Sequence, residues 1–114
     1  MANINYPFGS PVIFTVPTGI GTYEYTIAND YTIIDAKSLL SANTRRLKLK
    51  FDQWLKVGAR MIIMQKASGG KGITLGTGFS GLAQVSAASK KLTTCDFIYD
   101  GTAFIPTGGV FTQS

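Results

Sequence analysis

The stretch FIYDGTAFIP, residues 97–106, contains the clearest structural signal in this chain. Apolar and aromatic residues stand on both sides of Asp100 and Gly101. An Asp-Gly pair between two β-prone segments favours a two-residue type I′ turn, because both central residues of that turn need a positive φ angle. We therefore predict an antiparallel hairpin here, in which Tyr99 and Phe104 pack against each other across the two strands.

The rest of the chain repeats this pattern of short apolar runs between turn residues. Such runs recur about every ten residues, which is typical of an all-β sandwich or barrel. The prolines on both sides of residues 12–16 favour an edge strand, because proline cannot donate to the interior of a sheet. We expect further strands at 22–27, 31–36, 45–51, 60–66 and 73–79, followed by the hairpin strands within 92–106.

Three of these segments carry more specific expectations. Residues 28–30 are expected to form the turn between strands 22–27 and 31–36, because Asn29 and Asp30 are turn residues. The apolar run 60–66 suits a central strand that is covered on both faces, with residues 73–79 as its hairpin partner. Gly76 and Gly78 indicate a bulge or a close approach of two backbones.

Length and composition indicate one folded domain. The chain has 114 residues, of which 45% are hydrophobic and 15% are charged. A disordered chain would have fewer apolar residues and more charge. The charged share lies below the usual ~25%, so we expect part of the surface to be hidden in an assembly.

The residues needed for common catalytic and metal sites are missing from this sequence. It contains no histidine and one cysteine, so Ser-His pairs, Cys-His pairs, intrachain disulfides and Cys/His metal clusters are all excluded. The glycine-rich stretch 69–78 differs from a phosphate-binding loop, because Lys71 is followed by Gly72 and an expected strand. The carboxylates are scattered along the chain, and most lie beside expected turns or strand ends. We predict no catalytic residue, no cofactor, no metal site and no enzymatic activity.

Targeting signals are also missing from the sequence. Residues 1–11 lack a basic stretch followed by a long apolar run, and no apolar stretch approaches the ~18 residues of a membrane span. We therefore expect synthesis in the cytoplasm and no membrane partner.

The segment RRLKLKF, residues 45–51, shows the cleanest alternation and supplies the best candidate for a binding surface. Arg46, Lys48 and Lys50 point to one face, about 7 Å apart along the strand, and the intervening apolar residues point to the core. This basic face suits an acidic neighbour or a phosphate backbone, but a solvated strand that resists edge pairing explains it too. Nucleic acid is the less favoured partner, because no aromatic residue alternates with the cations on that face.

Aromatic residues supply a second, weaker candidate. Trp54 is the only tryptophan, and Tyr23, Tyr25 and Tyr31 precede it in the chain. Flat rings such as that of Trp54 stack on sugars, but in a small β domain they also pack in cores and interfaces. Both interpretations remain open at this stage.

Two segments resemble a known group of proteins. ITLGTGF (73–79), followed after a short stretch by CDFIYDGTAFI (95–105), is similar to the C-terminal half of small β-structured domains in virion proteins of tailed bacteriophages. Such domains occur in head-decoration proteins, head fibres and tail-fibre modules. The resemblance implies a jelly-roll-like β-sandwich, usually a homotrimer, without enzymatic activity. It assigns only a hairpin-forming role to Tyr99, Asp100, Gly101 and Phe104.

These observations lead to one prediction for the whole chain. We expect a single antiparallel β-sandwich over residues 1–114, jelly-roll-like, with flexible arms at 1–11 and 106–114 that order on assembly. Its expected function is capsid decoration or a fibre base in the virion, as a homotrimer that docks on a neighbour such as the major capsid protein. The alternatives are a receptor- or carbohydrate-binding module that uses Trp54 and, less favoured, a small nucleic-acid-binding barrel.

Overall fold

The computed structural model describes residues 11–16, 21–36, 45–66, 72–82, 84–86 and 92–112. All regular elements in these ranges are strands, which confirms the all-β prediction. They are β1 (Val12–Thr15), β2 (Gly21–Ile27), β3 (Tyr31–Ala36), β4 (Arg45–Phe51), β5 (Arg60–Lys66), β6 (Gly72–Leu75), β7 (Gln84–Ser86), β8 (Leu92–Tyr99) and β9 (Phe104–Thr112). No helix capable of crossing a membrane occurs within these ranges.

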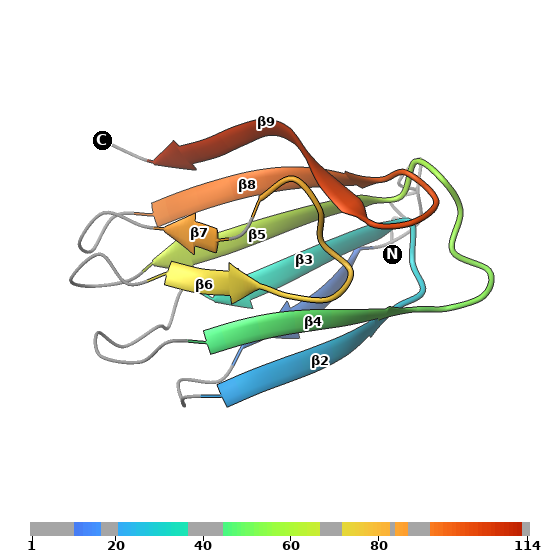
Figure 1. Ribbon diagram of the computed structural model, residues 1–114, viewed down its shortest axis with the longest axis horizontal. Helices are drawn as coiled ribbons and strands as arrows, with labels where there is room; N and C mark the ends of the chain where they lie inside the picture. The colour runs from blue at the N-terminus through green and yellow to red at the C-terminus, as the bar shows by residue number, and fades with distance from the viewer. Residues whose placement is uncertain are drawn as a thin grey trace, which may run out of the picture.

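The strands form two sheets that pack face to face (Figure 1). The five-stranded sheet has the order β1-β3-β5-β8-β9, and the four-stranded sheet has the order β2-β4-β6-β7. From β1 to β6 the chain changes sheet at every connection. β1 lies at an edge of its sheet, as the two flanking prolines predicted.

Strand direction differs from the expected antiparallel arrangement. β1, β3 and β5 pair in parallel, and so do β2, β4 and β6. Only the pairs β5–β8, β6–β7 and β8–β9 are antiparallel among the described strands. The antiparallel prediction is therefore wrong for the first two thirds of the chain, and a jelly roll is not confirmed.

Two connections explain this difference. Residues 28–30 carry the chain from β2 in one sheet to β3 in the other, so the turn residues do not close a hairpin there. The expected hairpin between 60–66 and 73–79 is wrong for the same reason, because β5 pairs with β3 and β8 while β6 pairs with β4 and β7. Alternation sets which face of a strand is buried, but it does not choose the strand's neighbour.

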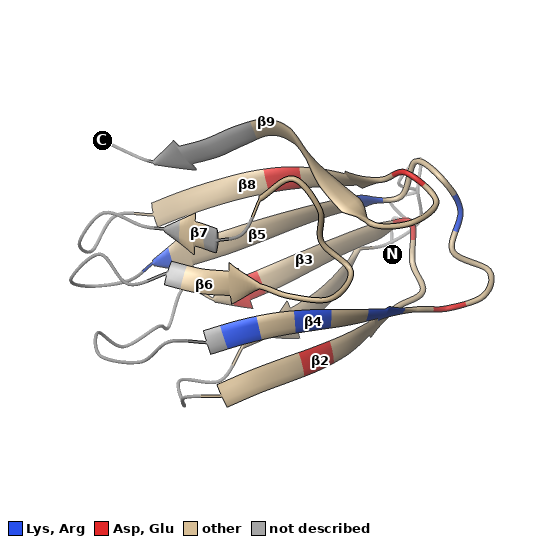
Figure 2. Ribbon diagram, viewed as in Figure 1, with Lys and Arg blue, Asp and Glu red and all other residues tan. Residues whose placement is uncertain are grey.

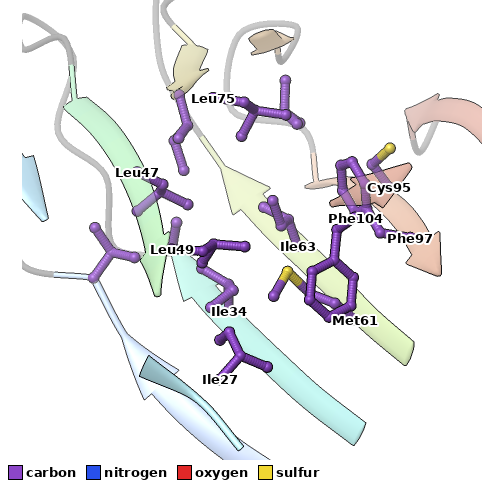
Figure 3. Close-up of a cluster of buried hydrophobic side chains, with 14 of the residues drawn as sticks. Ile27, Ile34, Leu47, Leu49, Met61, Ile63, Leu75, Cys95, Phe97 and Phe104 are labelled. Carbon is purple, nitrogen blue, oxygen red and sulfur yellow. The ribbon is translucent and has the colours of Figure 1, made fainter. Parts of the chain in front are cut away.

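The core lies between the two sheets (Figure 3). Alternate residues of each strand point inward, as the period of two requires. The five-stranded sheet contributes Ile34, Met61, Ile63 and Phe97, among others, and the four-stranded sheet contributes Ile27, Leu47, Leu49, Ile73 and Leu75. The inward direction predicted for Leu47 and Leu49 is confirmed. β5 is central as predicted, but the outward side chains of Ile62 and Met64 are only half-buried.

The closing hairpin is confirmed, with a longer loop than predicted. β8 and β9 are antiparallel, Tyr99 lies opposite Phe104, and their ring centroids are 5.4 Å apart. The loop contains residues 100–103 and not two residues. The Asp100 carboxylate accepts hydrogen bonds from the backbone N–H groups of Thr102 (2.8 Å) and Ala103 (2.9 Å), which stabilises the wider loop. Gly101 has a φ of 103°.

Of the two predicted arms, only the C-terminal one lies mostly within the described residues. Residues 106–112 belong to β9, whose backbone pairs with β8 as far as Thr112, so this part of the expected arm is a strand. Residues 1–10 and 113–114 lie outside the described residues, and Pro11 directly precedes β1.

The segment after β6 joins the two sheets, which explains its glycines. Gly76 N–H donates to the Leu47 carbonyl of β4 (2.8 Å), and Phe104 N–H of β9 donates to the Gly78 carbonyl (2.9 Å). Gly78 has a φ of 98°, and a Cβ built there would lie 2.6 Å from Leu49 Cβ. The predicted close backbone approach is therefore confirmed.

Candidate docking surface

Basic residues occupy alternate positions along β4 of the four-stranded sheet (Figure 2). Because Leu47 and Leu49 point into the core, the intervening side chains of Arg46, Lys48 and Lys50 point outward. Arg46 and Lys50 are exposed, and Lys48 is half-buried. We call these three residues the basic strip.

The neighbouring strand β2 neutralises part of this charge. Glu24 lies opposite Lys48 in the parallel register, and its Oε1 is 3.4 Å from Nζ of Lys50. These two side chains are 67% (Lys50) and 41% (Glu24) exposed, so water and salt screen their attraction. Within the described part of the chain, no hydrogen bond or ion pair engages the side chains of Arg46 and Lys48. As far as the described ranges show, two cations of the strip therefore have no ion-pair partner within the chain.

On the other side of β4, a glycine makes room for these two cations. A Cβ built at Gly76 would lie 2.9 Å from Arg46 Nε and 3.3 Å from Lys48 Cγ. The missing side chain therefore lets both cations lie close against the sheet. The sequence indicated a close approach at Gly76, but it did not show that the basic strip was involved.

Trp54 is exposed, and the structure does not combine it with the tyrosines considered as sugar-stacking partners. It lies on the turn after β4, is 75% exposed, and its backbone N–H donates to Asp52 Oδ2 (3.0 Å). Tyr23 and Tyr25 pack instead against the core, and the ring of Tyr25 stacks on that of Phe14 at 4.7 Å. Tyr31 belongs to β3 of the other sheet.

Cys95, the single thiol of the chain, is not a reactive nucleophile in this fold. Cys95 is buried, and desolvation together with the nearby charge of Asp96 raises the pKa of its thiol to about 11. At neutral pH this thiol is protonated and a poor nucleophile. No group of three potential metal-ligating side chains occurs in the ranges that the structure describes.

One feature of the surface had no counterpart in the sequence analysis. A hollow of about 200 Å³ is lined by Tyr31, Arg60, Met61 and Asp96. These residues come from three strands whose pairing the sequence did not predict, so no local pattern connects them.

No protein-family model matches the chain, and no curated protein matches its sequence.

Proposed function

We propose that this protein is a non-enzymatic structural component of a tailed-bacteriophage particle, a capsid-decoration or fibre-base protein that docks through its basic strip on an acidic neighbouring surface. In this proposal the chain is a homotrimer, and the neighbour is a virion protein such as the major capsid protein. The observation that carries it is the pair of outward cations, Arg46 and Lys48, which have no acidic partner among the described residues.

The geometry of the strip suits a broad protein surface. The cations follow one strand at intervals of about 7 Å and lie on the regular face of a sheet. Complementary charges of this kind steer association and fix its orientation more than they add raw affinity. A particle surface that displays the same acidic group repeatedly would offer complementary charge to this row of cations.

The two segments that resemble phage virion domains also meet in the fold. Phe79 and Phe104 form a parallel bridge, and Ser80 N–H donates to the Phe104 carbonyl (3.0 Å). Residues 73–79 and the hairpin therefore belong to one structural unit that joins both sheets. The two segments that carry the resemblance are therefore neighbours in space as well as in sequence.

The proposal is tested on particles of the phage that encodes this chain. Mass spectrometry of gradient-purified particles is expected to find the chain in a fixed ratio to the major capsid protein. Purified chain added to particles that lack it should rebind, and the double variant Arg46→Glu/Lys48→Glu should rebind about tenfold more weakly.

The control for net charge is the double variant Lys56→Glu/Lys66→Glu, which makes the same charge change at two exposed positions outside the strip. It is expected to rebind like the unmodified chain. Equal weakening of both double variants would refute docking through the strip. Absence of the chain from purified particles would refute the structural role.

A further inference from the structure

Three of the residues that line the hollow, Tyr31, Arg60 and Asp96, lie on the outer face of the five-stranded sheet, away from the basic strip. The side chain of the fourth, Met61, belongs to the core. Along β3, β5 and β8 the buried residues alternate with Tyr31, Arg60 and Asp96, so these three side chains point outward. The hollow measures about 200 Å³.

Strand pairing brings the three side chains together. Tyr31 and Arg60 are direct partners in the parallel pair β3–β5. Asp96 on β8 lies opposite Ile62, two residues beyond Arg60 on the same side of β5. Diagonal neighbours of this kind lie about 7–8 Å apart, within reach of long side chains and of one bridging ligand.

Asp96 occupies an irregular point of β8. The register with β9 shifts between Cys95 and Phe97, so Asp96 has no direct partner on β9. Thr107 Oγ1 donates to the backbone carbonyl of Asp96 (3.4 Å) and ties the two strands together at this point. Such bulges re-aim a side chain and are frequent beside binding sites. Here the bulge is located at the carboxylate that lines the hollow.

The polar groups around the hollow have no partner among the residues that the structure describes. Across the described part of the chain, the phenol of Tyr31, the guanidinium of Arg60 and the carboxylate of Asp96 make no hydrogen bond and no ion pair. Arg60 and Asp96 are exposed and Tyr31 is half-buried. An unpaired cation and an unpaired anion thus line one hollow together with an aromatic ring.

Each group selects a part of the ligand. A guanidinium forms two parallel N–H···O bonds with a carboxylate, as it also can with a phosphate. An ionised carboxylate accepts hydrogen bonds only, so Asp96 requires hydroxyl or N–H donors. An aromatic ring such as that of Tyr31 packs against an apolar C–H surface. Because the hollow is smaller than the ~300 Å³ of ordinary ligand pockets, it suits one small unit.

We propose that this hollow binds one acidic sugar unit, a hexuronic acid residue of a polysaccharide. Arg60 binds its carboxylate, Asp96 accepts hydrogen bonds from its hydroxyl groups, and the ring of Tyr31 packs against its C–H face. The site is independent of the basic strip, so it stands whether or not the chain docks on a particle through β4.

Titration of the ¹⁵N-labelled chain with glucuronic acid tests this site, with glucose as the uncharged comparison. Shifts are expected at backbone amides of β3, β5 and β8 with millimolar affinity, and glucose should bind about tenfold more weakly because it cannot pair with Arg60. Arg60→Lys keeps the positive charge but cannot form the two parallel N–H···O bonds of a guanidinium. It should therefore weaken glucuronic acid binding while glucose binding is unchanged. Tyr31→Ala removes the ring that packs against the C–H face, so it should weaken the binding of glucuronic acid and of glucose alike.

Arg46→Ala is the matched control, since it removes an exposed arginine from the other sheet. It should leave the affinity for glucuronic acid unchanged. The proposal is overturned if Arg60→Lys binds glucuronic acid as tightly as the unmodified chain, if Arg46→Ala weakens binding equally, or if glucose binds as well as glucuronic acid. The thermal midpoint of each variant, measured in parallel, confirms that the sheet is intact.

Discussion

At the scale of single residues, Asp100 organises the loop of the closing hairpin. Its exposed carboxylate accepts N–H groups from Ala103 and Thr102, and its own backbone N–H donates to the Ala103 carbonyl (3.0 Å). These hydrogen bonds favour the ionised form, so the pKa of Asp100 lies below its ordinary value.

The pH dependence of this contribution has a definite sign. A carboxylate whose pKa is lowered by folding stabilises the fold above the unfolded pKa of about 4, and the contribution is lost as the pH falls through the folded pKa. We expect Asp100→Ala to lower the midpoint of thermal unfolding at pH 7, and the difference from the unmodified chain to shrink below about pH 4. A difference that does not depend on pH would contradict this role.

Gly78 illustrates a position where only glycine fits. Its positive φ and the 2.6 Å distance from a built Cβ to Leu49 Cβ act together against any side chain. We expect Gly78→Ala to reduce the free energy of unfolding by about 3 kcal/mol, measured by urea denaturation. Gly108→Ala is the control, because a Cβ there meets nothing within 4 Å. Equal stability of the two variants would show that the approach at Gly78 is not tight.

At the scale of elements, a buried polar side chain links the two sheets. Gln65 of β5 is fully buried, and its Oε1 accepts a hydrogen bond from the backbone N–H of Ile73 in β6 (3.1 Å). The bond therefore crosses between sheets, and it provides the acceptor for a buried N–H group near the start of β6. Two strands that follow each other in the chain without pairing are held together in this way.

Removing the Gln65 acceptor should destabilise the fold, because the buried N–H group of Ile73 would then be desolvated without a hydrogen bond. We expect Gln65→Leu to destabilise the fold by about 2 kcal/mol in urea denaturation. Gln65→Glu at low pH, where the protonated carboxyl still offers an acceptor oxygen, should lose less. Unchanged stability of Gln65→Leu would mean that the bond between the sheets contributes little.

At the scale of the whole molecule, the edge strands of both sheets at one side are β1 and β2. Phe14 of β1 and Tyr25 of β2 stack across the gap between the sheets, and Tyr25 Oη donates to the Thr15 carbonyl (3.4 Å). Three large apolar side chains are also exposed on the surface: Ile13 (60%), Trp54 (75%) and Val57 (71%). Such surfaces are consistent with the assembly that we propose.

The proposed trimer has a direct test. Light scattering coupled to size-exclusion chromatography should give a mass near 37 kDa, three times the 12.2 kDa of the chain. Association through small interfaces depends on protein concentration, so the measurement is made over a tenfold range of concentration. A mass of one chain at every concentration would contradict the trimer and leave docking through the basic strip to be tested separately.

The sequence alone determined the properties that depend on neighbouring residues. Alternation in residues 45–51 placed the leucines inside and the cations outside, and Asp100-Gly101 located the chain reversal, because side-chain direction and turn preference are local properties. Only the tertiary structure decided which strands are neighbours. A short connection such as residues 28–30 serves a hairpin or a crossing between sheets equally well, so the parallel pairing was not predictable. The hollow at Tyr31, Arg60 and Asp96 exists only through that long-range pairing, so no local sequence pattern predicted it.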